Sequence, residues 1–160
     1  MPTVVVASDA NWVRDHVRAA LCGPGFEVIE VEHGPDMRRV VADRTPDLVI
    51  LDFQIGNMGG VAVALDLRLE ESGDRLPHVP ILILLDREAD KFLARRSTAD
   101  AMLVKPIDAG TVRRSVKTLL AAEEERRAAA ADHDLEAGTG PGSGRRVPAE
   151  TPSGPEEAVG

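Results

Sequence analysis

The stretch "DLVILDFQIG" (residues 47–56) decides the fold, because it places four consecutive apolar residues directly before a carboxylate. A continuous apolar run of this kind, without polar alternation, is typical of a central strand of a parallel sheet that is buried on both faces. Asp52 then stands at the carboxyl end of that strand. Burying an unpaired charge is costly, so an acid in this place predicts a specific role.

Other apolar runs occur along the chain, and segments of helical period separate them. We expect strands over residues 3–7, 26–31, 47–52, 80–85 and 101–104. We expect helices over residues 12–21, 35–43, 60–71 and 87–96, and a fifth that begins near the favourable cap residue Asp108. This alternation predicts an α/β protein with a doubly wound, five-stranded parallel sheet of the flavodoxin-like type. The second run alternates with glutamates, as suits an edge strand, and right-handed crossovers then give the strand order 2-1-3-4-5.

The helical segments also predict which side chains face the core. In the third helix the spacing favours Val61, Leu65 and Leu69, and in the fourth it favours Phe92 and Leu93.

Charged residues follow three of the predicted strands. Asp9 follows the first strand, Asp52 ends the third, and Lys105 follows the fifth. Ligands bind at the carboxyl ends of such strands, where the strand order reverses, so these side chains should share one crevice. Two neighbouring carboxylates repel each other unless a cation lies between them, and oxygen ligands of this kind suit Mg²⁺. The arrangement predicts a phosphoryl-transfer site in which one carboxylate attacks phosphorus.

Composition excludes several classes of partner. The net charge of -8 argues against direct binding of nucleic acid, which depends on clustered Lys and Arg. Cys22 is the single cysteine, which excludes an internal disulfide and fits a reducing compartment. No run reaches the roughly 18 apolar residues of a membrane span, and the N-terminus does not have the pattern of a signal peptide. We therefore expect a cytoplasmic protein without a membrane partner.

The composition changes near residue 131. Residues 131–160 contain six Gly, four Pro and six acids against two Arg, with few large apolar side chains. Such a segment cannot offset its ordering entropy by burial. We expect one folded domain over residues 1–122, an extension of the last helix over 123–130, and a disordered, acidic, Gly/Pro-rich tail over 131–160.

Three motifs within residues 3–122 resemble the receiver domains of two-component response regulators. "VVVASDANWVRDHVRAAL" (4–21) is similar to the first strand, acidic corner and first helix of that family. "LVILDFQIGNMGG" (48–60) resembles the strand and loop of the phosphoacceptor aspartate, and "AMLVKPID" (101–108) resembles the Lys-Pro motif. Each motif is weak by itself, but the ordered set is specific.

The resemblance implies a CheY-like signalling module rather than a conventional enzyme, although such a domain assists its own phosphoryl transfer. Asp52 would accept a phosphoryl group from a histidine kinase or a phosphotransfer protein. Asp9, Asp52 and the backbone carbonyl of Gln54 would hold Mg²⁺, and Lys105 would contact the phosphoryl oxygens.

Several positions depart from the family's pattern. Ser8 replaces the first of two adjacent acids, which should weaken Mg²⁺ binding without abolishing it. Leu85 stands where the family has the Thr or Ser of its conformational switch, and Met102 stands where that switch has an aromatic residue. In the loop after the acceptor, Gly56 replaces a common Pro and Gly59 replaces an acid. The resemblance is therefore to an atypical receiver.

Two other functional classes fit the sequence less well, and a third alternative stays open. A haloacid-dehalogenase-like phosphatase needs a second acid two residues after its nucleophile, and Gln54 stands there. A flavodoxin-like nucleotide binder needs a phosphate-cradling loop after the first strand, but "SDANW" (8–12) has no Gly and carries an acid. A pseudo-receiver, which keeps the fold as a phosphorylation-independent interaction module, stays open because of Leu85 and Met102.

The segment after the fifth helix lacks the patterned helices of a DNA-binding domain. We therefore expect a stand-alone receiver that signals by protein–protein contact. By analogy with the family, its docking face would combine the fourth helix, fifth strand and fifth helix, with the basic side chains of Lys91, Arg95, Arg113 and Lys117.

Overall fold

The structure, a computed structural model, describes residues 1–23 and 25–138. Its centre is a five-stranded sheet of order β2-β1-β3-β4-β5, in which every neighbouring pair is parallel. The strands are β1 (Thr3–Ala7), β2 (Glu27–Val31), β3 (Leu48–Asp52), β4 (Ile81–Leu85) and β5 (Ala101–Val104). The predicted strand order and fold class are confirmed.

Burial follows the position of each strand in the sheet. Every residue of β3 and β4 is buried, and in β1 only the first residue is partly exposed. The edge strands β2 and β5 are covered less, and of their residues only Val31 is buried. The central strands therefore need apolar residues on both faces, which explains their continuous apolar runs.

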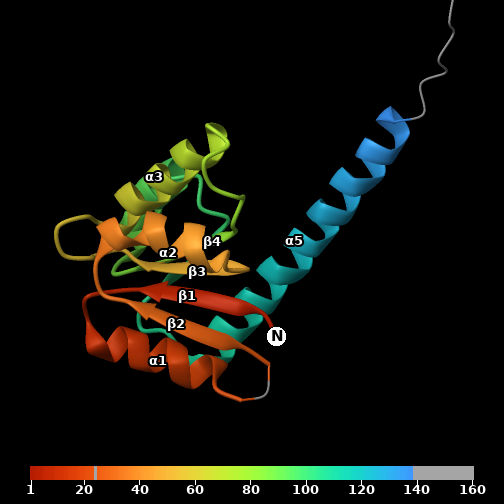
Figure 1. Cartoon of the computed structure of the whole chain (residues 1–160). Coiled ribbons are helices and arrows are strands. Elements are labelled where there is room, and N and C mark those ends of the chain that lie inside the picture. The colour runs from red at the N-terminus through yellow and green to blue at the C-terminus, as the bar shows by residue number, and fades with distance from the viewer. Residues whose placement is uncertain (24, 139–160) are drawn as a thin grey trace, which may run out of the picture.

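Helices cover both faces of the sheet and make two separate cores (Figure 1). They are α1 (Asn11–Leu21), α2 (Met37–Arg44), α3 (Gly60–Ser72), α4 (Lys91–Arg96) and α5 (Ala109–Ala137), with short 3-10 turns η1 (Gly34–Asp36) and η2 (Glu88–Asp90). Val4 and Val6 pack with α1 and α5, whereas Val5 and Ala7 pack with α2, α3 and α4. The alternation of side chains along a strand thus divides β1 between the two cores.

The predicted core faces of α3 and α4 are largely wrong, although Val61 of α3 packs partly buried against the core. In α3 the buried residues are Gly60, Val63, Ala64 and Leu67, and both Leu65 and Leu69 are exposed. In α4 only Ala94 is buried, while Phe92 and Leu93 are exposed. Both helices carry apolar residues around much of their circumference, so spacing alone did not identify the face that packs.

The start of α3 lies against the end of β3. A Cβ atom on Gly60 would come within 2.1 Å of the backbone oxygen of Asp52, and the Gly60 amide donates to the Phe53 carbonyl at 3.0 Å. Glycine at this position therefore allows the loop between Asp52 and α3 to close tightly.

Helix α5 is longer than composition predicts. It runs to Ala137, so residues 131–137, expected in a disordered tail, are helical. They continue the helix from the alanine run at residues 128–131, whose high helix propensity outweighs the absence of burial. Figure 1 shows this end of α5 standing clear of the sheet and the other helices. The rest of the predicted tail, residues 139–160, lies outside the described residues.

Within residues 1–23 and 25–138, the structure has no helix with the length and apolar character that a membrane span requires.

Candidate functional site

Asp52 ends β3 and is 2% exposed, with a partner on each carboxylate oxygen. The Ser8 hydroxyl donates to Oδ2 at 2.6 Å, and the Lys105 ammonium donates to Oδ1 at 2.6 Å. Ser8 follows β1, the neighbour of β3, and Lys105 follows β5. The carboxyl ends of three parallel strands thus bring Ser8, Asp52 and Lys105 together, as the topology predicts.

Asp9 lies on the same edge of the sheet and contacts the loop that follows Asp52. Its Oδ2 accepts a hydrogen bond from the Gly56 amide at 2.9 Å. A Cβ atom on Gly56 would come within 3.0 Å of that same oxygen. Gly56 therefore provides both an N–H donor and the space for Asp9, and the proline common in the family could not donate here.

The oxygen groups at this edge have the chemistry of a magnesium site. Asp9, Asp52 and the carbonyl of Gln54, an exposed residue of the same loop, offer only oxygen ligands, which Mg²⁺ prefers. Across residues 1–23 and 25–138, no cluster of three or more His, Cys, Asp or Glu side chains is close enough to enclose a metal. Two carboxylates and a carbonyl would leave room for waters and phosphate oxygens, which is a ligand set that suits Mg²⁺.

Lys105 is shared by two carboxylates. Its Nζ lies 2.6 Å from Asp52 Oδ1 and 2.8 Å from Asp86 Oδ1. Burial alone would lower the pKa of this ammonium, but the hydrogen bonds to Asp52 and Asp86 outweigh it, so the pKa is raised above its usual value. The ammonium also lies 5.5 Å from the ring centroid of Trp12, a cation–π contact from the first turn of α1. Lys105 is therefore held charged beside Asp52.

Leu85 and Met102 contribute no hydroxyl group at this edge. Leu85 ends β4 fully buried, and the Lys105 amide donates to its carbonyl at 2.8 Å. Met102 in β5 packs against the same core, on the face covered by α2, α3 and α4. Burying the Leu85 side chain contributes about 1.5–3 kcal/mol to folding, a gain that a hydroxyl group would not supply.

Sequence reasoning missed two charged residues near the site. Asp86, directly after β4, forms the second partner of Lys105. Arg14 in α1 is 5% exposed, donates to the Ser8 carbonyl and pairs with Glu32 at 3.0 Å. The position of Asp86 at a strand end was a usable signal, the same one that identified Asp9 and Lys105. Arg14 gave none, because a single Arg on a helix is usually solvated.

The predicted basic docking face is divided by the structure. Arg113 Nε donates to the Ala20 carbonyl at 2.9 Å, and Arg113 and Lys117 line a cavity with Leu21 and Cys22 at the end of α1. These two side chains therefore lie toward α1. Lys91 on α4 pairs with Glu88 at 2.6 Å.

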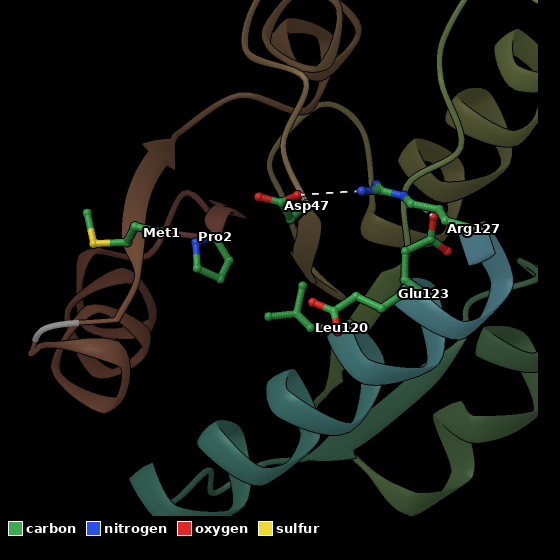
Figure 2. A pocket seen from close by; sticks show the side chains of 7 residues that line it. Met1, Pro2, Asp47, Leu120, Glu123 and Arg127 are labelled. Carbon is green, nitrogen blue, oxygen red and sulfur yellow. Dashed lines mark hydrogen bonds and ion pairs between the residues drawn. The ribbon is translucent and has the colours of Figure 1, made fainter. Parts of the chain in front are cut away.

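A separate cavity lies at the other end of the strands, where β3 begins (Figure 2). Met1, Pro2 and Leu120 line it together with the charged residues Asp47, Glu123, Glu124 and Arg127. Asp47 precedes β3, whereas Asp52 ends it, so this cavity and the Asp52 site lie at opposite ends of the same strand. None of the predicted site residues lines it.

Comparison with known proteins agrees with this geometry. A family model described as the response regulator receiver domain matches residues 4–133. The KDP operon transcriptional regulatory protein KdpE of Escherichia coli is 32% identical over 122 residues, which cover 75% of this chain and 52% of KdpE. Protein PilH of Pseudomonas aeruginosa is 26% identical over 121 residues, which cover 76% of this chain and 99% of PilH. The signal receiver domain of NarL from Mycobacterium tuberculosis aligns with a TM-score of 0.65 and 26% identity over 74% of this chain and 95% of that domain.

The two curated relatives differ in length. The chain spans about half the length of KdpE, a transcriptional regulatory protein, but nearly all of PilH. The residues that the family model matches, 4–133, include nearly the whole parallel sheet together with Asp9, Asp52 and Lys105. The chain therefore belongs to the receiver domain family of two-component response regulators.

Proposed function

We propose that this receiver accepts a phosphoryl group on Asp52 and signals by protein–protein contact. The observation that carries the proposal is the paired environment of Asp52, whose two oxygens meet the Ser8 hydroxyl and the Lys105 ammonium at the carboxyl edge of the sheet. A buried carboxylate with a fixed cation beside it is suited to a reaction that adds negative charge at that point.

The donor would be a phosphohistidine of a histidine kinase or a phosphotransfer protein. A carboxylate oxygen of Asp52 forms a bond to phosphorus while the bond from phosphorus to the histidine nitrogen breaks. The electron pair of that bond stays on the imidazole, which takes up a proton. Lys105 would stabilise the phosphoryl oxygens, because its ammonium already lies at hydrogen-bond distance from Asp52.

Receiver domains generally bind Mg²⁺, and bound Mg²⁺ would neutralise charge on the phosphoryl oxygens. In this chain Asp9, Asp52 and the Gln54 carbonyl would hold it. The Gly56 amide orients Asp9 by its hydrogen bond to Oδ2, which leaves the other carboxylate oxygen for a ligand. The Ser8 hydroxyl fixes Asp52 without adding a third negative charge.

The test is the intact mass of the purified protein after incubation with Mg²⁺ and acetyl phosphate. We expect one phosphoryl adduct on the wild type, none on Asp52→Asn, and loss of the adduct when a chelator removes Mg²⁺. An equal adduct on Asp52→Asn would place the chemistry at another residue.

A pseudo-receiver is the second candidate, and the apolar Leu85 and Met102 favour it. In that case the domain would bind its partner whether or not it met a phosphoryl donor. Absence of any adduct with acetyl phosphate, together with no transfer from several phosphorylated histidine kinases, would decide for this alternative. The downstream partner would then be sought by capture with the unmodified protein.

We further propose a cytoplasmic location, since the single cysteine fits a reducing compartment. The net charge of -8 supports a protein partner rather than nucleic acid.

A further inference from the structure

The Lys105 ammonium lies between two carboxylates that belong to different parts of the chain. Asp52 ends β3, and Asp86 is the first residue after β4. Both contacts are short, at 2.6 Å and 2.8 Å, and only 13% of the Lys105 side chain is exposed. A single ammonium therefore serves two acids in a place where solvent screens them little.

Asp86 has unusually poor compensation for its charge. Its Oδ2 is buried, and among the described residues it has no hydrogen-bond partner. The whole side chain is 30% exposed. Among the ion pairs of the described residues, Lys105 is the cation that pairs with this carboxylate. Weakening that contact leaves an acid with little to hold it in place.

Asp86 also begins the segment that leads into α4. The chain continues from Asp86 through η2 to α4, and the Arg87 amide is tied to Asp90 Oδ2 at 3.0 Å within that segment. The preceding residue, Leu85, has no polar side-chain atom with which to sense Asp52. Lys105 binds both Asp52 and Asp86. Within the described part of the chain, the Asp86–Lys105 ion pair therefore connects Asp52 to the segment that leads into α4.

Phosphorylation changes the competition for Lys105. A phosphoryl group on Asp52 brings additional negative charge and several acceptor oxygens to the ammonium, while it repels the Asp86 carboxylate. A signal can only be sent if the two states make different contacts, and this exchange of partners supplies such a difference.

We propose that Asp86 couples Asp52 to α4: phosphorylation draws Lys105 away from Asp86 and releases the β4–α4 segment. This deepens the proposed function, on which it rests. The coupling works by loss of an ion pair, in place of the hydroxyl attraction that Leu85 cannot provide. Asp86 is a positioning residue in this account, since it acts through Lys105.

The experiment is hydrogen exchange of residues 86–96, measured on the full chain with and without acetyl phosphate and Mg²⁺. The samples are the wild type, Asp86→Asn, and the control Glu88→Gln, which removes an acid from the same segment without touching Lys105. Intact mass, recorded on each sample, gives the fraction phosphorylated.

Loss of the ion pair should accelerate exchange in this segment about fivefold or more. We expect this acceleration in the phosphorylated wild type and also in unphosphorylated Asp86→Asn. Phosphorylation of Asp86→Asn should add no further acceleration, a non-additivity that a merely structural role of Asp86 would not produce. Glu88→Gln should keep the wild-type response to phosphorylation.

Two results would overturn the inference and leave the proposed function intact. One is a phosphorylated wild type whose residues 86–96 exchange at the unphosphorylated rate. The other is an Asp86→Asn protein that still responds to phosphorylation as the wild type does. Absence of an adduct in the mass spectrum would overturn both proposals together. If Asp86→Asn does not fold, Asp86→Ala replaces it, and the wild-type comparison alone still decides whether phosphorylation releases the segment.

Discussion

Ser8 shows how one residue changes the electrostatics of the site. Its hydroxyl donates to Asp52 Oδ2 at 2.6 Å and accepts from the Ala10 amide at 3.1 Å. The two neighbouring acids usual in the family would place a further carboxylate at this position, beside Asp52. With Ser8, Asp52 is instead stabilised by a neutral donor and by Lys105, so folding of this edge depends less on a bound cation.

Replacing Ser8→Asp should make the stability of the protein depend on Mg²⁺. The new carboxylate would lie against Asp52, and repulsion at this distance should lower the free energy of unfolding by about 1–4 kcal/mol without metal. Saturating Mg²⁺ should restore most of that loss, because the cation binds both acids. Urea unfolding with and without Mg²⁺ measures the effect, and Ser8→Asn is the uncharged control. A loss that is the same at both Mg²⁺ concentrations would contradict this electrostatic account.

At the scale of single elements, the strands were easier to predict than the helix faces. In β3 the apolar run correctly predicted a strand that is buried on both faces and ends at Asp52. Helix α3 begins "GVAVALDLRL" (60–69), so several stripes are equally apolar, and the one that packs contains Val63 and Leu67 and not Leu65 and Leu69. Which stripe is buried depends on how the helix packs on β3 and β4. The spacing of apolar residues within one helix does not carry that information.

The start of α5 was predicted from one cap residue. The Asp108 side chain accepts a hydrogen bond from the Thr111 amide at 2.9 Å, as an N-cap should. Asp108→Ala should lower the free energy of unfolding by about 1 kcal/mol, because an N–H donor of the first turn loses its partner. Asp108→Ser, which can still cap, should lose less than half of that in the same chemical denaturation assay. Equal losses in the two variants would show that the cap is not the source of the effect.

Glu123, in the middle of α5, contacts two arginines of its own helix and His78 outside it. It is 6% exposed, receives hydrogen bonds from Arg126 and Arg127, and lies 3.5 Å from His78 Nε2. The hydrogen bond from Arg126 lowers the pKa of the Glu123 carboxyl, burial opposes this, and Arg127 adds to the lowering. A carboxyl whose pKa is lower in the folded state stabilises the fold above its unfolded pKa and loses that contribution as the pH falls through the folded value.

Glu123→Gln should therefore be destabilising at pH 7, by roughly 1–3 kcal/mol, because the arginines lose a charged acceptor. The difference from the wild type should shrink as the pH falls below the ordinary carboxyl pKa of 4.5. Urea unfolding at pH 7 and near the acid end of the stable range measures it, with the exposed neighbour Glu124→Gln as control. A difference that does not change with pH would mean that the charge of Glu123 is not what matters.

At the scale of the whole molecule, topology brought the site together. Alternating strands and helices predicted the order β2-β1-β3-β4-β5 and a parallel sheet, and the parallel direction puts the carboxyl ends of β1, β3 and β5 on one edge. Asp52 and Lys105 are in direct contact there, as strand ends should be. The contact of Asp9 with Gly56 and the sharing of Lys105 with Asp86 were not predictable, because they depend on loop conformations that residue spacing does not determine.

The most direct test of the central claim is to locate the phosphoryl group on the chain. An acyl phosphate is reduced by borohydride, which would convert a phosphorylated Asp52 into homoserine that peptide mass spectrometry can place. After treatment with Mg²⁺ and acetyl phosphate, we expect homoserine at position 52 of the wild type, and none when Mg²⁺ is removed. Reduction at any other aspartate, or an adduct that survives borohydride with Asp52 unchanged, would contradict the account.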